Sequence, residues 1–451
     1  MNTEKQPNQW HKMGFTRRSF LKASSLGYLA LEAGGSLAWA KTGKSSNELV
    51  RVGVIGCRNK GYNVLREILR TGRALCVAMC DVDDEVLQRR AAELKKETGQ
   101  SPKLYVDFRK MLENPEIDAV IVGSPDHWHC LHAVYAMEAG KDVYVEKPLA
   151  NSIHECNLIA AAAQRYGRVV QVGQQQRSGD VWNGLMDYLK SGALGGLRRV
   201  NCWANFAYGA GAPKVPDTAV PEGVDFRLWL GPAPERTFNA SRFHGNWRHF
   251  WDYGGGLMTD WGVHLLDMAL WAKDITEEPT KVSGFGMNLS GLDRARETYD
   301  TQSVLYQMDD FLIQWQQNGG IERGPYEKSY GVEYVCDGGT IVADREDWTL
   351  YPEGKETDTE QAEAFKLRSG RSDMDLHANN FLDCVLSRKL PNCSVEIGRN
   401  VALYAHFGNV LARTGAGSLD WDATQQQFVG HAPANGLIVP DYHHGWKLPA
   451  V

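Results

Sequence analysis

The sequence lacks three features, and each absence excludes a class of protein. It has no basic block and a formal net charge of -6, so a small molecule is a more natural partner than nucleic acid. Beyond residue 40 no run approaches 18 apolar residues, so no membrane span is expected in the mature chain. The nine cysteines form no CxxC pair and no Cys/His cluster, which favours buried thiols over a disulfide framework or a zinc site, and no metal is expected.

The chain of 451 residues is 43% hydrophobic and 23% charged, as in globular proteins, and its length favours two domains. The first 40 residues differ from the rest. TRRSFLK (16–22) pairs two arginines before a modestly apolar stretch, and Ala38, Trp39 and Ala40 form a small-x-small cleavage site. This segment resembles a twin-arginine signal, although a disordered basic N-terminus is the alternative. We expect a signal over residues 1–40, a linker over 41–48, export by the twin-arginine machinery and a periplasmic mature protein.

From Leu49 to Gly173, short β-rich runs alternate with helical patterns. The runs are VRVGVIG, ALCVAMC, DAVIVGS, DVYVE and RVVQVG. Strands and helices in alternation, mostly with short links, indicate βαβ units around a parallel sheet. Residues 49–173 are therefore expected to form a doubly wound Rossmann domain in an α/β protein.

The first junction between strand and helix, GCRNKG (56–61), keeps only the outer glycines of a GxGxxG spacing. Gly56 allows a tight turn and Gly61 lets the helix pack closely, but Arg58 stands where a glycine would leave room for a pyrophosphate. One interpretation is that nucleotide binding is lost. The other is a rebuilt loop, in which the helix N-terminus still binds phosphates and Arg58 adds a cation.

Asp81 favours the rebuilt loop. It follows the second strand, twenty residues after Gly61, where a carboxylate accepts the ribose hydroxyls of NAD and disfavours NADP. The residues expected to bind the cofactor in this part of the chain are Gly56, Arg58, Asn59, Lys60, Gly61 and Asp81.

Two further motifs carry a family resemblance. SPDHWH (124–129) follows the DAVIVGS strand, and AGKDVYVEKP (139–148) ends in an EKP triplet. With the first turn, they resemble the glucose-fructose oxidoreductase and inositol dehydrogenase family, Gfo/Idh/MocA, over essentially the whole mature chain. The resemblance implies that Lys147 lies beside the nicotinamide and reaches the reacting hydroxyl. It also implies cofactor contacts from Ser124, Pro125, His129 and Glu146.

Alternatives remain for these residues. Lys147 on its own would be interpreted as a surface lysine. His127 and His129 would equally suit a helix start with no chemical role.

After residue 173, aromatic and β-branched runs separated by turns predict an open, mainly antiparallel sheet in an α+β domain over residues 174–451. The runs are LRRVNCWANFAY, KVSGFGMNL, SVLYQM, FLIQWQQ and YGVEYVCDGGTIVA. Two helices around a Pro turn follow, with a packing role, although His377 at the start of the first could face the pocket. The family's second domain exposes one sheet face, which implies a homo-oligomer, a dimer or tetramer.

Gln174, Gln175 and Arg177 begin this domain, where the family has a segment facing cofactor or substrate. Ordinary loop polarity explains these three residues equally well.

WDYGGGLMTDWGVHLLD (251–267) is the stretch richest in chemistry. Three glycines precede a predicted helix that places Asp260 and His264 at i and i+4 on one face. The helix dipole holds such a histidine toward its neutral form, which suits a general base. Two metal ligands without an evident third, or a capping and core pair, are the alternatives. The family places a DxxxH pair opposite its EKP lysine, and Asp267 is expected to hold the second nitrogen of His264.

The preceding stretch, FRLWLGPAPERTFNASRFHGNWRHF (226–250), is rich in aromatics and arginine, as expected where sugar faces stack. The candidate substrate residues are Trp247, Arg248, Trp251 and Tyr253, and a buried aromatic cluster is the alternative.

The expected function is an oxidoreductase that uses tightly bound NAD(H) to oxidise a secondary hydroxyl of a sugar or glycoside. Because the periplasm has no nicotinamide pool, the hydride would return to a second keto substrate. One alternative is an NAD-dependent glycosidase acting by transient oxidation at sugar carbon 3 and elimination. A non-catalytic sugar-binding protein is the other.

Overall fold

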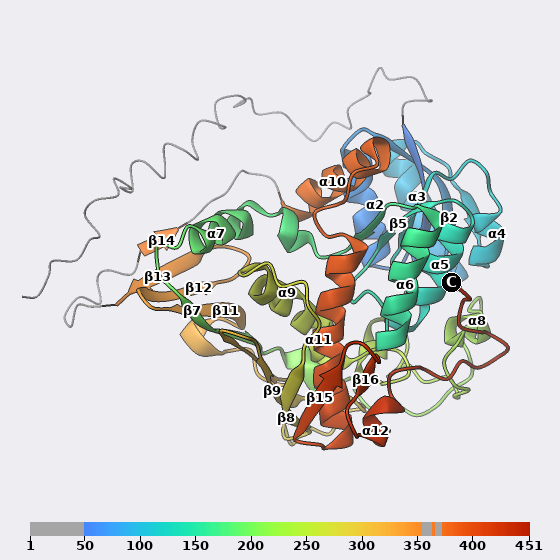
Figure 1. The fold of residues 1–451 in the computed structure, drawn as a ribbon. Coiled ribbons are helices and arrows are strands. Elements are labelled where there is room, and N and C mark those ends of the chain that lie inside the picture. Colours follow the sequence, from blue (N-terminus) through green and yellow to red (C-terminus); the bar gives the residue numbers. More distant parts are fainter. Residues whose placement is uncertain (1–48, 354–362, 366–371) are drawn as a thin grey trace, which may run out of the picture. The chain divides into compact units, whose positions relative to one another are not determined.

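The computed structural model describes residues 49–353, 363–365 and 372–451 (Figure 1), so the predicted signal and linker lie outside the described residues. Six parallel strands form the first sheet, in the order β3-β2-β1-β4-β5-β6. This order reverses between β1 and β4, as in doubly wound dinucleotide-binding sheets, and confirms the predicted Rossmann fold. The elements are β1 (Val50–Ile55), α2 (Lys60–Arg70), β2 (Ala74–Cys80), α3 (Asp84–Thr98), β3 (Lys103–Tyr105), α4 (Phe108–Leu112), β4 (Ala119–Val122), α5 (Asp126–Glu138), β5 (Asp142–Val145), α6 (Ile153–Tyr166) and β6 (Val170–Val172).

The sequence explains these elements locally. β4 and β5 are buried along their whole length, which is why their runs are apolar without alternation. α3 begins after Asp83, whose side chain accepts a hydrogen bond from the Val86 N–H, and ends at Gly99 with φ 77°. β3 and α4 are too short to show a period in the sequence.

The second sheet has ten strands in the order β14-β13-β12-β11-β7-β10-β9-β8-β15-β16. β7 and β10 run parallel and their neighbours antiparallel, which confirms the predicted mainly antiparallel sheet. The strands are β7 (Leu197–Ala204), β8 (Lys281–Met287), β9 (Thr301–Gln307), β10 (Leu312–Asn318), β11 (Tyr330–Cys336), β12 (Gly339–Ala343), β13 (Trp348–Pro352), β14 (Glu363–Phe365), β15 (Ser418–Asp422) and β16 (Gln427–Phe428).

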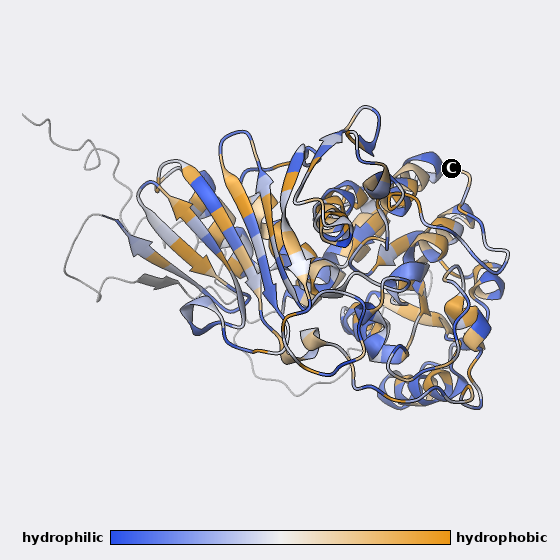
Figure 2. Cartoon of the chain, turned by 90° about the horizontal axis from the view of Figure 1, so that it is seen from below, coloured by the Kyte–Doolittle hydropathy of each residue, from blue (hydrophilic) through white to orange (hydrophobic). Residues whose placement is uncertain are grey.

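One face of this sheet is covered and the other is open. α9 (Val263–Trp271) and α11 (Val395–Thr414) pack on the covered face. Residues alternate between buried and exposed along β9, and hydrophobic and hydrophilic residues alternate along the strands in Figure 2. Apolar side chains on the open face include Phe285, Met287 and Leu305.

The C-terminal helices join the two domains. α10 (Asp373–Ser387) packs against α2, and Phe381 and Leu382 belong to the same hydrophobic core as β1. α11 runs between the layers, against α6 on one side and β8 and α9 on the other (Figure 1). The core of the Rossmann domain therefore includes a helix from beyond residue 173.

Further helices of the second domain are α7 (Asp180–Lys190), α8 (Phe226–Leu230) and α12 (Ala432–Asn435).

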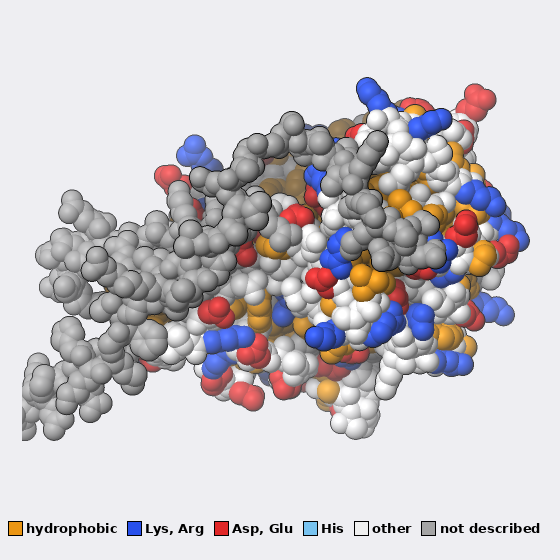
Figure 3. Space-filling view, turned by 90° about the horizontal axis from the view of Figure 1, so that it is seen from above, with side chains coloured by type: hydrophobic (Ala, Val, Ile, Leu, Met, Phe, Trp, Pro, Cys, Tyr) orange, Lys and Arg blue, Asp and Glu red, His pale blue; other side chains and the backbone are white. Residues whose placement is uncertain are grey.

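On the visible described surface in Figure 3, acidic and basic side chains are interspersed. Arg73 and Asp383, 2.6 Å apart, form one such pair between the first domain and α10. Of the helices that the structure describes, none has the length and apolar character needed to cross a membrane.

Candidate active site

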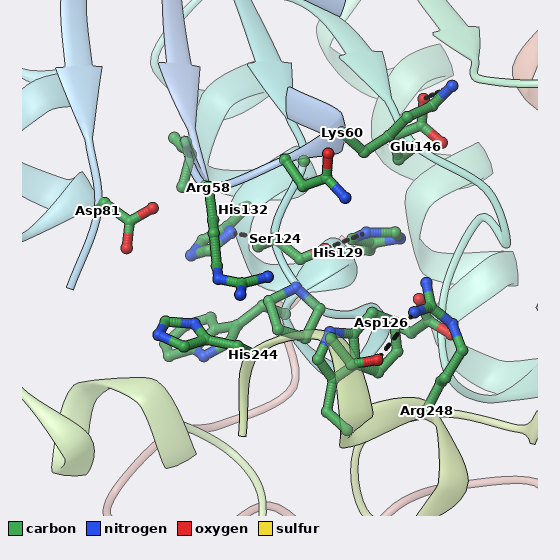
Figure 4. Close-up of a pocket in the computed structure, with 18 of the residues that line it drawn as sticks. Arg58, Lys60, Asp81, Ser124, Asp126, His129, His132, Glu146, His244 and Arg248 are labelled. Carbon is green, nitrogen blue, oxygen red and sulfur yellow. Dashed lines mark hydrogen bonds and ion pairs between the residues drawn. The ribbon is translucent and has the colours of Figure 1, made fainter. Parts of the chain in front are cut away.

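A cavity of about 390 Å³ lies at the carboxyl ends of β1, β2, β4 and β5 and is bounded on its other side by residues of the second domain (Figure 4). Ligands of open α/β sheets bind at this edge, near the reversal of strand order. The cavity brings together many of the residues predicted from the sequence: Gly56, Arg58, Asn59, Lys60, Asp81, Ser124, Pro125, His129, Glu146, Lys147, Gln175, Trp247, Arg248, Asp260 and His264.

The turn between β1 and α2 requires its two glycines. Gly56 has φ 84°, and a Cβ there would lie 2.6 Å from the Ser124 nitrogen. A Cβ at Gly61 would lie 2.1 Å from the Gly56 carbonyl oxygen. Because no side chain fits at either position, the backbone of the turn stays bare at the N-terminus of α2, where phosphate groups bind in such folds.

Arg58 lines this cavity with an exposed side chain that extends toward His244 (Figure 4). Its backbone is held from outside, because Arg90 donates to the Arg58 carbonyl oxygen from Nη2 at 2.6 Å and from Nε at 3.2 Å. Arg90 therefore holds the loop through its backbone, and the loop leaves a guanidinium beside the glycine turn.

Asp81 faces the cavity from the end of β2. Its Oδ2 accepts a hydrogen bond from the Cys57 N–H at 2.7 Å, and its Oδ1 accepts one from the Asp83 N–H at 3.1 Å. Burial raises the pKa of Asp81 to about 6. A bare glycine turn at a helix N-terminus with a carboxylate at the tip of the next strand is the arrangement that holds a dinucleotide, so the residues present fit this cofactor.

Lys147 and Asp260 meet at the other end of the cavity. The Lys147 ammonium donates to Asp260 Oδ1 at 2.5 Å and to the Asp260 carbonyl oxygen at 2.8 Å. Asp260 Oδ2 accepts from the Tyr208 hydroxyl at 2.7 Å and lies 3.4 Å from Arg248 Nε. Burial on its own would raise the pKa of Asp260, but the charges of Arg248 and Lys147 hold it well below its usual range. Asp260 is therefore ionised.

His264 is buried beside this pair and lines the cavity. Its Nδ1 has no hydrogen-bond partner among the described residues. Burial, followed by the positive charges of Arg345 and Lys147, lowers the pKa of His264 well below its usual value. The imidazole is therefore neutral, as predicted, but burial rather than the helix dipole is the main cause.

Two details of this segment differ from the sequence-based expectation. Met258–Gly262 forms a π-helical turn before α9, so Asp260 and His264 are not one α-helical turn apart. The predicted contact between Asp267 and His264 is wrong. Arg177, stacked on Trp271, donates to Asp267 Oδ1 from Nη2 at 2.7 Å and from Nε at 2.9 Å, and thereby occupies that carboxylate.

The four candidate substrate residues separate into two pairs. Trp247 and Arg248 line the main cavity. Trp251 lies in a neighbouring cavity under the guanidinium of Arg413, and Tyr253 is fully buried in an aromatic cluster with Trp229. Tyr253 therefore fits the alternative interpretation, a buried aromatic cluster. Trp247 and Arg248 are placed to contact a ligand.

The remaining predicted polar residues have protein partners. His129 lies within hydrogen-bond distance of the Ser124 and Pro148 carbonyl oxygens, and His127 of the Trp229 carbonyl oxygen. His377 contacts the Ser178 hydroxyl and the Val172 carbonyl oxygen and does not line the main cavity. Gln174 donates to the Val263 carbonyl oxygen.

In the part of the chain that the structure describes, no three His, Cys, Asp or Glu side chains are grouped to hold a metal ion.

The cavity also contains residues that sequence reasoning missed. Asp126, within the quoted SPDHWH motif, is buried, and burial raises its pKa well above its usual range. Arg345, in the turn after β12, stacks on Trp261 at 4.6 Å. Position in the motif could have indicated Asp126, but nothing in the sequence around Arg345 marks it.

Comparison with known families matches both domains to one family. Residues 50–174 match "Oxidoreductase family, NAD-binding Rossmann fold", and residues 188–284 match "Oxidoreductase family, C-terminal alpha/beta domain", the two domains of Gfo/Idh/MocA proteins. The chain belongs to this family. Its first domain is thus of the NAD-binding kind, and the resemblance noted in the EKP segment is confirmed.

Relatives in the family include glycoside hydrolases. An alpha-N-acetylgalactosaminidase from Shewanella oneidensis is 32% identical over 169 residues, 33% of this chain and 37% of that protein. Glycosyl hydrolase family 109 protein 1 from Shewanella sp. (strain ANA-3) is 29% identical over 201 residues, 40% of this chain and 44% of that protein. The matches thus span less than half the length of these relatives.

Solved structures share the fold over both domains. The aldose-aldose oxidoreductase of Caulobacter crescentus has a TM-score of 0.64 at 16% identity, covering 82% of this chain and 99% of that one. A levoglucosan dehydrogenase in complex with NADH and levoglucosan has a TM-score of 0.63 at 18% identity, with the same coverage. At this level of identity the similarity shows the fold.

Proposed function

We propose that this protein uses NAD(H) to oxidise a secondary hydroxyl of a sugar or glycoside to a ketone. The observation that carries the proposal is the cluster of Lys147, Asp260 and His264 at one end of a cavity whose other end holds the glycine turn and Asp81. An ammonium, a carboxylate and a neutral imidazole are the groups that removal of a hydroxyl proton requires.

In the proposed reaction, the neutral His264 accepts the hydroxyl proton while Lys147 donates a hydrogen bond to the hydroxyl oxygen. Asp260 stays ionised beside both residues, and its charge favours the imidazolium that forms. The nicotinamide, when bound, supplies the acceptor for the hydride of the same carbon. Burial of His264, and of most of the Asp260 side chain, limits the access of water that would compete for the proton.

Export and tight cofactor binding belong to the same proposal. The N-terminal sequence supports export by the twin-arginine machinery to the periplasm, where a dissociating NADH could not be replaced. We therefore infer that the cofactor stays bound and that a second keto substrate re-oxidises it. The open, partly apolar face of the second sheet would serve contact between copies in a homo-oligomer.

The test is the near-ultraviolet absorbance of reduced nicotinamide in the purified mature protein, with a panel of glycosides added and no NAD. A rise to about one equivalent per chain is expected, reversed by a keto sugar. If denaturation releases nucleotide but no glycoside reduces it, the substrate class is wrong. If no nucleotide is released and added NAD does not bind, the protein is a sugar-binding relic of the fold.

The Shewanella glycosidases favour a second candidate, cleavage of a glycosidic bond through transient oxidation. This chemistry needs an acid for the leaving group, and Asp126, whose protonated form is favoured by burial, lines the same cavity. Free aglycone from an aryl glycoside, without net accumulation of reduced nicotinamide, would favour this candidate. An Asp126→Asn variant should then lose aglycone release while still reducing bound NAD.

A further inference from the structure

Arg345 brings to the catalytic end of the cavity a positive charge that forms no ion pair with a carboxylate of the described residues, although Asp373, Asp260 and Glu146 attract it from a greater distance. Lys147 and Arg248 face Asp260, and Lys60 lies 3.7 Å from Glu146. By contrast, no Asp or Glu oxygen in residues 49–353 and 372–451 forms an ion pair with Arg345 within 4.0 Å. A half-buried guanidinium with no described carboxylate in direct contact is poorly compensated, so a ligand anion would be stabilised there.

The orientation of Arg345 is fixed by neutral groups. Its guanidinium lies over the rings of Trp261 at 4.6 Å and Tyr330 at 6.0 Å. Nε and Nη2 both donate to Gln176 Oε1, at 3.1 and 3.0 Å. Nη1 makes no hydrogen bond to the described residues, so the edge formed by Nη1 and Nη2 keeps two N–H groups for a ligand. Two parallel donors at this edge match the two oxygens of a carboxylate.

We propose that the substrate is a sugar acid, or a glycoside of one, and that Arg345 binds its carboxylate. The inference rests on the proposed function, since it names the substrate class of the same site. Among the described cations at the catalytic end, Lys60, Lys147 and Arg248 have ion-pair partners, which leaves the single charge of Arg345. One positive charge matches a monoanion, whereas a phosphate ester, with nearly two charges, would call for a second unpaired cation there.

Binding of a carboxylate would also act on His264. Arg345 is the charge that most strongly opposes protonation of His264. Neutralising this charge makes His264 a stronger base as the substrate binds. An acidic sugar would therefore be favoured both in affinity and in the proton-transfer step.

The experiment uses the full protein loaded with NADH, so that sugars bind without turnover. Dissociation constants are measured for matched pairs: methyl glucoside and methyl glucuronide, methyl galactoside and methyl galacturonide, and glucose with glucose 6-phosphate. We expect at least one uronide to bind about 10-fold or more tightly than its neutral partner, in line with a charge-assisted bidentate contact.

The Arg345→Gln variant should lose that preference while the neutral partner binds within about 2-fold of the wild type, since only one charge-assisted contact is removed. Arg345→Lys keeps the charge without the planar fork and should retain part of the preference. The exposed Arg323, changed to Gln, is the matched control. Thermal unfolding of each variant separates a binding loss from a folding loss.

Three results would overturn the inference: equal binding within every pair, equal weakening of both partners by Arg345→Gln at unchanged stability, or preference for the phosphate. If neutral glycosides reduce bound NAD without preference for acids, the proposed function stands and the inference alone falls. If the protein contains bound nucleotide, but neither acidic nor neutral sugars bind to the protein or reduce that nucleotide, both the proposed function and the inference are wrong.

Discussion

The Lys147 ammonium lies 2.5 Å from the Asp260 carboxylate, although the two residues are 113 positions apart and belong to different domains. Lys147 follows β5 of the Rossmann sheet, and Asp260 lies in the π-helical turn that precedes α9. The pair exists only when the two domains pack together. Assembly of the catalytic cluster is therefore coupled to the contact between the two domains that forms the cavity.

Replacing Lys147 with Met should lower turnover by about 100-fold or more, because the hydrogen bond to the reacting oxygen is lost. Nucleotide binding should persist, since the glycine turn and Asp81 are unaffected. Turnover and nucleotide content are the measurements. Lys281, partly exposed on β8 and 3.1 Å from Asp420, provides the control substitution to Met. Equal losses in both variants, or full activity of Lys147→Met, would contradict the assignment.

Asp81 should determine the choice between NAD and NADP. The Asp81→Asn variant removes the charge that repels a 2′-phosphate, so the ratio of NADP to NAD dissociation constants should fall by about 10-fold or more. Asp107, at the N-terminus of α4, is a partly exposed control carboxylate. An unchanged ratio in Asp81→Asn would show that the ribose lies elsewhere.

Much of the fold was predictable because its signals are local. Strand and helix periods, the outer glycines of the first turn and the EKP triplet all lie within short stretches. The two glycines of the first turn were predictable because the turn leaves no room for side chains. A side chain at Gly61 would collide with the backbone of Gly56. The short β3 and the edge strands beyond β12 carry too few residues to show a period.

Residues that depend on tertiary packing could not be assigned from the sequence. Trp247 and Tyr253 lie in one aromatic stretch, yet one lines the cavity and the other is fully buried. Asp267 is near His264 in sequence but is bound by Arg177, 90 positions away. Arg345 enters the site from a turn whose sequence has no motif. In each case the deciding contact is with a distant segment.

Arg58 should contribute a cationic contact to the cofactor rather than block it. Its Ala variant should bind NAD about 10-fold more weakly, as expected for loss of a charge-assisted hydrogen bond to phosphate, and with a smaller dependence on salt. Titration of nucleotide-free protein at two salt concentrations measures both effects. Tighter binding by the variant would show that the arginine obstructs the loop. Arg66, a half-buried residue of α2 beside Glu97, is the control for substitution to Ala.

His377 should make stability depend on pH, although it does not line the main cavity. Burial lowers its pKa to about 4, whereas in the unfolded chain it is about 6.5. Between these values the unfolded state binds the additional proton, so the free energy of unfolding falls as pH falls, by up to about 1.4 kcal/mol per pH unit for this group. His377 contributes fully above pH 6.5, and its contribution is lost toward pH 4.

The His377→Leu variant tests this, because it removes the titrating group while filling the same buried space. Its hydrogen bonds to Ser178 and Val172 are also lost, so the variant should be less stable than the wild type at pH 7. Its unfolding free energy should nevertheless fall less steeply between pH 6.5 and 4. Denaturant titrations across this range measure the slope, and His443→Leu in the exposed C-terminal segment is the control. If the slope of His377→Leu equals that of the wild type, His377 binds as many protons in the folded state as in the unfolded state. Other buried histidines would then account for the acid sensitivity.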